Sequence, residues 1–256
     1  MRSRIRFFAL ACALLTSVGN GRCGETTSRK NEKSEFNEEL MGARGFARAV
    51  VLPHVDFRDS PLSEVLDFLR SKAGRVRPDG MEMNIVFKPR ATREERGITG
   101  DAKDIRLDKL IEMVAHQEGY AVRWDGYAAV VETRVSRRPE IRTTNARSKK
   151  DIETVGRLWR LVLPSVKINH QPLREVLKYL SEESLKASPE LGGVPFELKL
   201  PAGDDGPKIT LRLDHVVLAE AIRYAAELSG STLSVNGEKV EFRLKDKRRI
   251  SSERSR

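Results

Sequence analysis

Three residues in the C-terminal half of the chain carry side chains suited to metal binding or acid–base catalysis: His170, Asp214 and His215. His170 and His215 lie 45 positions apart, and each stands between an apolar strand pattern and an amphipathic helix pattern. If the two turns are related by pseudo-symmetry, the imidazoles lie near each other, with Asp214 beside one of them. Imidazole and carboxylate groups bind metals and transfer protons. These three residues are therefore the candidate metal-binding residues of the sequence.

A structural role for the same positions is the favoured interpretation. The equivalent positions of the N-terminal half hold Asp59 and Asp104. Aspartate and histidine are ordinary residues where a chain turns into a helix, because they accept hydrogen bonds from free N–H groups or tolerate unusual backbone angles. Glu64, Glu175 and Glu220 are expected in first helical turns, where negative charge suits the helix dipole.

Other catalytic patterns are absent from the sequence. Asp204-Asp205-Gly206 offers two adjacent carboxylates but no further ligand spacing, which is a weak metal signal. The sequence has no phosphate-binding glycine loop, no nucleophile elbow and no paired cysteine or histidine spacing. We therefore expect no enzyme activity, no catalytic or cofactor-binding residue and no cofactor. A small hydrolase or metal-dependent protein that uses the His170 and His215 turns remains the alternative.

The elements that must position these turns form a repeat. Leu52–Leu69 and Leu163–Leu180 are identical at nine of eighteen positions, and the match at an offset of 111 continues without a gap to Val131. Each copy begins as an alternating strand, and a proline then opens a helix, where its missing N–H is tolerated. A shorter repeat, with an offset of 45, relates the two strand–helix units inside each copy.

This pattern predicts an α+β fold of two tandem β-α-β-β-α-β domains, residues 49–133 and 158–244, each with two helices packed on one small sheet. In the first domain we expect helices at 61–72 and 106–117. The expected strands are 50–57, 83–88, 98–104, 120–124 and 128–132. The last two strands flank Asp125-Gly126, which is a strong hairpin signal, so the last strand of the β-α-β-β-α-β order is expected to pair in a hairpin.

Two segments of the chain resemble the secretin and TonB N-terminal short domain family. They are VDFRDSPLSEVLDFL with NIVF and IRLDKLIEMVAHQEGYAVRWDGYAAVVE, and VKINHQPLREVLKYL with FELKL and ITLRLDHVVLAEAIRYAAELSGSTLSVNGEKVEF. The resemblance covers about two thirds of the chain and rests on apolar and turn positions. It implies a periplasmic docking and assembly module without catalytic residues. Only a basic tail follows Leu244 in the sequence, so a pore or receptor role is not carried over.

The N-terminal segment has the form of an export signal. Arginines at positions 2, 4 and 6 precede the apolar run Phe7–Gly19, which is shorter than the ~20 residues of a membrane span. We expect a signal peptide at residues 1–19, a flexible polar spacer at 20–48 and a periplasmic or cell-envelope location. Cys23 is a candidate lipidation site, although Asn20-Gly21-Arg22 is a poor match to lipoprotein signals.

The positive charge is concentrated outside the predicted domains. The net charge is +10, and residues 133–160 hold nine basic and three acidic residues. We therefore expect a basic linker at 134–157 and a basic disordered tail at 245–256, which could make weak contact with an anionic envelope surface. A nucleic-acid-binding domain would carry this charge on its folded face, and the strands lack the stacking aromatics of RNA-recognition folds.

Together these features predict an exported envelope protein that acts by protein–protein docking, through sheet edges or a groove between helix and sheet. Its partner would be another envelope protein, with no nucleic acid and no transmembrane span. Weak binding of an anionic polymer or nucleic acid through the basic linker and tail is a second alternative.

Overall fold

The repeated strand–helix unit is present in the computed structural model, which describes residues 42–76, 80–90, 97–133, 138–144, 148–200 and 204–244. In helix α3 (Leu62–Val76) the expected apolar stripe of Leu62, Val65, Leu66 and Leu69 is buried. All the described residues fall within one compact unit, residues 37–256. The predicted signal peptide, Cys23 and the basic tail lie outside the described residues.

The first half of this unit contains three helices and five strands among the described residues. In chain order they are α2 (Ala43–Ala49), β1 (Val51–Ser60), α3, β2 (Ile85–Phe87), β3 (Ile98–Arg106), α4 (Leu107–Gln117), β4 (Ala121–Trp124) and β5 (Ala129–Glu132).

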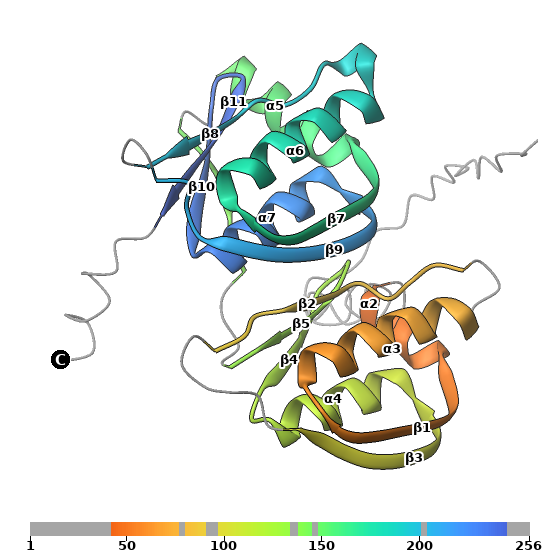
Figure 1. Cartoon of the computed structure of the whole chain (residues 1–256). Coiled ribbons are helices and arrows are strands. Elements are labelled where there is room, and N and C mark those ends of the chain that lie inside the picture. Colours follow the sequence, from red (N-terminus) through yellow and green to blue (C-terminus); the bar gives the residue numbers. More distant parts are fainter. Residues whose placement is uncertain are drawn as a thin grey trace, which may run out of the picture. The chain divides into compact units, whose positions relative to one another are not determined.

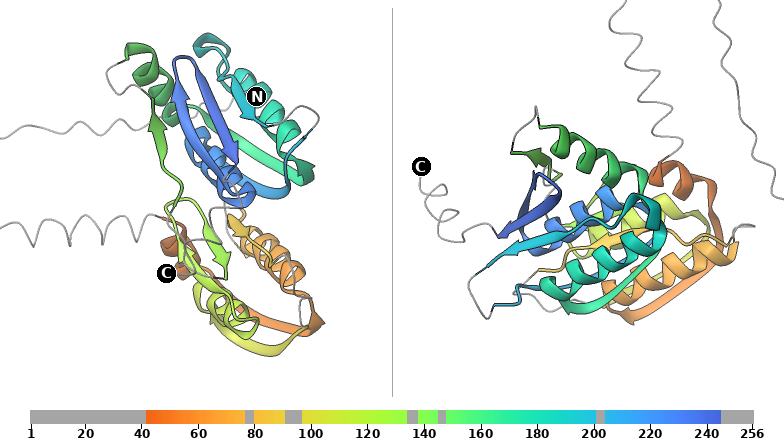
Figure 2. Two further views of the ribbon diagram at one scale, coloured as in Figure 1. Left: turned by 90° about the vertical axis from the view of Figure 1, so that its left-hand side faces the viewer. Right: turned by 90° about the horizontal axis from the view of Figure 1, so that it is seen from above.

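The second half begins with strand β6 and repeats this order. Its elements are β6 (Ile141–Thr143), α5 (Lys149–Arg160), β7 (Val162–Pro172), α6 (Leu173–Ala187), a short 3-10 helix η1 (Pro189–Leu191), β8 (Phe196–Lys199), β9 (Lys208–Val217), α7 (Leu218–Ser229), β10 (Ser231–Asn236) and β11 (Lys239–Leu244). From β1 to β5, each element starts within one residue of its counterpart 111 positions later. The same helix–strand arrangement is visible twice in Figure 1, and Figure 2 shows it from two further sides.

The fold is α+β, as predicted, but each half has two sheets where one was expected. In the first half, the antiparallel pair β1–β3 is separate from the sheet of order β2-β5-β4. In the second half, the antiparallel pair β7–β9 is separate from the sheet of order β6-β10-β11-β8. The apolar residues of both sheets in a half face the same helices, so α3 and α4 each contact strands of both sheets.

Two segments expected to be a flexible spacer and a linker contain regular structure. Helix α2 occupies the end of the predicted spacer, and β6 and most of α5 lie in the predicted linker. The hydroxyl of Ser148 accepts a hydrogen bond from the Asp151 N–H and caps α5. Two of the three buried residues of α5 are polar, Asp151 and Thr154. An apolar pattern therefore could not identify this helix.

The β2-β5-β4 sheet of the first half has apolar residues on both faces. Ala129 and Val131 of β5 belong to the core of the first half, whereas Ala128 and Val130 belong to the core of the second half. Consecutive residues of a strand point to opposite faces, so β5 is covered on both sides. Val86 of β2 also lies in the second core. The two halves therefore share apolar packing, and their separate-domain character stays a prediction.

Among the residues that the structure describes, no helix combines the length and apolar character needed to cross a membrane.

Candidate docking site on strand β4

The register of β7 and β9 separates the two candidate histidines. Leu163 pairs with Val216 and Ser165 with Asp214, which places His215 opposite Pro164. His170 lies six residues further along β7, at the other end of the strand pair. At ~3.3 Å per residue, this spacing corresponds to roughly 20 Å. The structure therefore does not bring His170 and His215 together, and both imidazoles are exposed.

The four variable turn residues share one backbone conformation. Asp59, Asp104, His170 and His215 have φ angles of 49°, 48°, 50° and 49°. This left-handed region is uncommon for residues with a side chain, and aspartate and histidine are among those that enter it most readily. The strand register shifts between Phe57 and Ser60 and again at the equivalent place in β7, as in a β-bulge. Asp59 and His170 lie in these bulges, whereas Asp104 and His215 adopt the same backbone conformation opposite Pro53 and Pro164, where the register does not shift.

A backbone role for His170 predicts a definite response to substitution. His170→Gly should keep or raise stability, because glycine enters the left-handed region without a steric penalty. His170→Val should destabilise the protein by about 1–3 kcal/mol, because a β-branched residue is strained there. Urea denaturation of both variants measures the difference. If the valine and glycine variants are equally stable, the bulge conformation does not explain the residue.

The remaining candidate residues make structural contacts. The side-chain amide of Asn84 accepts from the Asp214 N–H at 2.8 Å and donates to the Asp214 carbonyl at 3.0 Å. The Asp205 carboxylate accepts from Arg174 at 3.0 Å, and the Asp204 carboxylate accepts from the Gly206 N–H at 2.8 Å. Within the described ranges, no group of three or more histidine, cysteine, aspartate and glutamate side chains could hold a metal ion.

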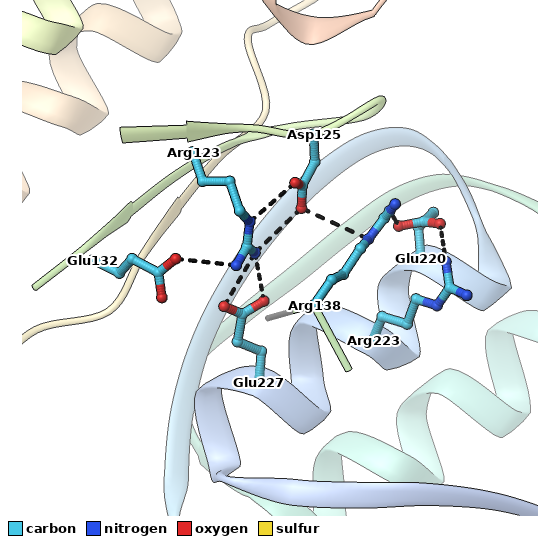
Figure 3. A network of polar contacts seen from close by, with 7 residues as sticks. All are labelled: Arg123, Asp125, Glu132, Arg138, Glu220, Arg223 and Glu227. Carbon is cyan, nitrogen blue, oxygen red and sulfur yellow. Dashed lines mark hydrogen bonds and ion pairs between the residues drawn. The ribbon is translucent and has the colours of Figure 1, made fainter. Parts of the chain in front are cut away.

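A network of buried charged side chains connects strand β4 to strand β5 and helix α7. Arg123 of β4 donates to Glu227 of α7 at 2.8 Å, to Asp125 at 3.0 Å and to Glu132 of β5 at 3.0 Å (Figure 3). Only 13% of the Arg123 side chain is exposed, and its three carboxylate partners are more deeply buried. Burial alone would lower the pKa of Arg123, but the hydrogen bonds to Glu227 and Asp125 raise it well above the ordinary value.

The network continues along α7. Glu220 pairs with Arg138 and, at 2.9 Å, with Arg223 (Figure 3). Arg138 also lies 3.7 Å from Asp125, which joins the two parts. The buried hydroxyl of Tyr224 has no hydrogen-bond partner among the described residues, and its pKa is raised, chiefly by burial. These contacts hold β4 against α7 through charge-assisted hydrogen bonds that solvent screens little.

The sequence interpretation missed this network but contained a signal for it. Glu220, Arg223, Tyr224 and Glu227 follow a helical spacing, and small and apolar residues fill the remaining positions of α7. In α4 the equivalent face is exposed and includes Met113. Apart from these four residues, α7 has no polar face in the sequence, and such a pattern is typical of a helix that is covered on all sides.

The outer edge of β4 pairs with no strand among the described residues. Asp125 N–H donates to the Ala128 carbonyl, and the register pairs Arg123 with Val130. In an antiparallel ladder the bonded pairs alternate, so the N–H and C=O groups of Val122 and Trp124 point away from β5. Both side chains pack on the first core, which fixes the position of the strand.

The equivalent edge in the second half is occupied. Strand β10 pairs in parallel with β6, in the register Leu233 with Ile141 and Val235 with Thr143. Leu233 and Val235 are the counterparts of Val122 and Trp124 at the offset of 111. Ile141 packs against the second core. The chain itself therefore shows how this type of edge receives a short parallel strand with one apolar residue facing inward.

Several other strand edges in the described part of the chain carry protective features. Strand β1 contains Pro53, β7 contains Pro164 and Pro172, and β8 contains Lys199 and follows Pro195. Proline and lysine discourage strand addition. The edge of β2 faces β9, where the Asn84 amide bonds to the backbone of Asp214. Strand β4, with the sequence Ala-Val-Arg-Trp, has neither protective residue.

No family model matches this sequence, no curated protein matches it, and no solved structure matches its fold. The resemblance to the secretin and TonB N-terminal short domain family therefore stays a prediction from the sequence.

Proposed function

We propose that this chain is an exported cell-envelope docking protein that binds a partner protein by strand addition at β4. The observation that carries the proposal is the difference between two equivalent edges: β10 is paired with β6, whereas β4 has no partner strand among the described residues. The occupant is an extended segment of an envelope protein, three to four residues long and parallel to β4. It places one apolar side chain on the first core, as Ile141 does on the second.

The structure around β4 suits this task. Backbone hydrogen bonds from an edge supply affinity in strand addition, and pockets beside the edge supply specificity. Trp124 lies at the outer edge of β4, and its indole N–H donates to Glu112 at 3.2 Å. Burial alone would raise the pKa of Glu112, but hydrogen bonds from Lys109 and Trp124 lower it below the ordinary value. The Arg123 network fixes the other face, so little ordering remains for binding.

Substitution of Val122 tests the proposal. Val122→Pro removes an outward N–H and places the proline ring at the edge, but it leaves the β4–β5 hydrogen bonds intact. We expect it to abolish capture of a specific partner from an envelope extract. Val122→Thr is the matched control, since it reduces the apolar surface of the side chain and keeps the backbone N–H.

The decisive result combines capture with amide hydrogen exchange. A captured protein that is lost with Val122→Pro, retained with Val122→Thr and protective of the amides at 121–125 is the expected partner. Equal capture by the wild type and both variants would show that binding does not use this edge. Protection at 121–125 by a second copy of the chain alone would replace the partner protein with self-association.

A further inference from the structure

A second site lies at the β2 edge of the β2-β5-β4 sheet, which is the edge opposite β4. There, residues of α3, β2, β7, β9 and α7 line a pocket of about 580 Å³. This volume is within the range of about 300–1,000 Å³ that is typical of small-molecule sites. One part of the pocket wall is apolar and another part is charged. Apolar side chains of both halves contribute to its lining: Leu66, Ile85, Phe87, Ile209 and Leu228.

The charged side chains of this pocket are mostly basic. Arg70, Lys88, Lys208 and Arg212 line it, whereas Asp67 is its one carboxylate among the described residues. Asp67 is shared, because it lies 2.6 Å from Arg70 and 3.3 Å from Arg212. Neither lysine has an ion pair among the described residues. The pocket therefore holds more positive than negative charge.

Arg70 marks the buried end of this charge cluster. Its side chain is nine-tenths buried, one terminal nitrogen donates to the Ile85 carbonyl at 2.5 Å, and its Nε has no hydrogen-bond partner in the described part of the chain. Burial lowers the pKa of Arg70, Asp67 opposes this, and the neighbouring guanidinium of Arg212 adds to the lowering. An anion in the pocket would relieve this crowding of positive charge.

We propose that this pocket binds an amphiphilic anion, with its carboxylate or phosphate group among Arg70, Arg212 and the two lysines and its apolar body on the side chains of both halves. Guanidinium groups suit both kinds of head group because they offer paired donors in a plane. This site is independent of the β4 edge.

Short alkyl compounds with different head groups test the proposal by calorimetry on the full chain. Octanoate and octyl phosphate are expected to bind, and octanol and inorganic phosphate are expected to bind at least tenfold more weakly. The ratio between the two alkyl anions identifies the preferred head group. Affinity should fall with added salt, because the lysines and Arg212 are partly exposed to solvent.

Arg212→Gln should weaken binding of the better anion about tenfold, as loss of a charge-assisted hydrogen bond implies. Arg174→Gln is the matched control: both side chains are 45% exposed and each pairs with one aspartate, but Arg174 does not line the pocket. Equal weakening by both variants, binding of octanol as tight as that of octanoate, or no binding of either anion would overturn the proposal.

Discussion

Replacing Arg123 with methionine is expected to lower the free energy of unfolding by about 3–5 kcal/mol, because it leaves buried carboxylates without their cation. Arg123 contacts Asp125, Glu132 and Glu227, and all three carboxylates are almost entirely buried. Methionine fills much of the same volume, so the loss reports on charge more than on packing. Denaturation in urea, followed by circular dichroism, measures the change.

Two further variants separate the ionic contribution from general effects. Arg58→Met removes an arginine from an exposed pair with Asp56, and such pairs contribute about 0–1 kcal/mol. The double variant Arg123→Met/Glu227→Met removes a buried charge of each sign and should recover part of the loss. If Arg123→Met costs no more than Arg58→Met, the network does not hold β4 against α7.

Replacing Leu180 with alanine is expected to cost about 2–5 kcal/mol, which is typical of truncating a fully buried leucine. Leu180 of α6 is 0% exposed, and so is its counterpart Leu69 of α3. Leu69→Ala is therefore expected to have an effect of similar size. Leu185→Ala, in the same helix as Leu180 but at a side chain that is 50% exposed, should change stability by less than about 0.5 kcal/mol.

The shape of the unfolding curve tests whether the two halves unfold together. Val86, Ala128 and Val130 of the first half lie in the second core, and Arg123 bonds to Glu227 across the halves. We therefore expect Leu69→Ala and Leu180→Ala each to shift one cooperative transition. A curve that splits into two transitions in either variant would show that the halves unfold independently, as separate tandem domains do.

The sequence by itself determined the repeated unit. The spacing of Leu62, Val65, Leu66 and Leu69 and of their counterparts specified the paired helices, because a helix buries one stripe wherever it is placed. The turn at Asp125-Gly126 specified the hairpin. The recurring polar residue at Asp59, Asp104, His170 and His215 marked four left-handed backbone positions, since local backbone geometry restricts which residues fit. These features depend on neighbours in the sequence, so the pattern was sufficient.

The tertiary structure decided how these units cover one another. Val86, Ala128 and Val130 are apolar, whereas their counterparts are Glu197, Lys239 and Glu241. That difference became meaningful only when the first-half sheet was seen to have both faces covered. The Arg123 network joins residues 104 positions apart, and no local pattern specifies such a contact. The same applies to β4 and β10, whose apolar residues occupy equivalent positions and do not show which edge is paired, because strand pairing is decided by the tertiary arrangement.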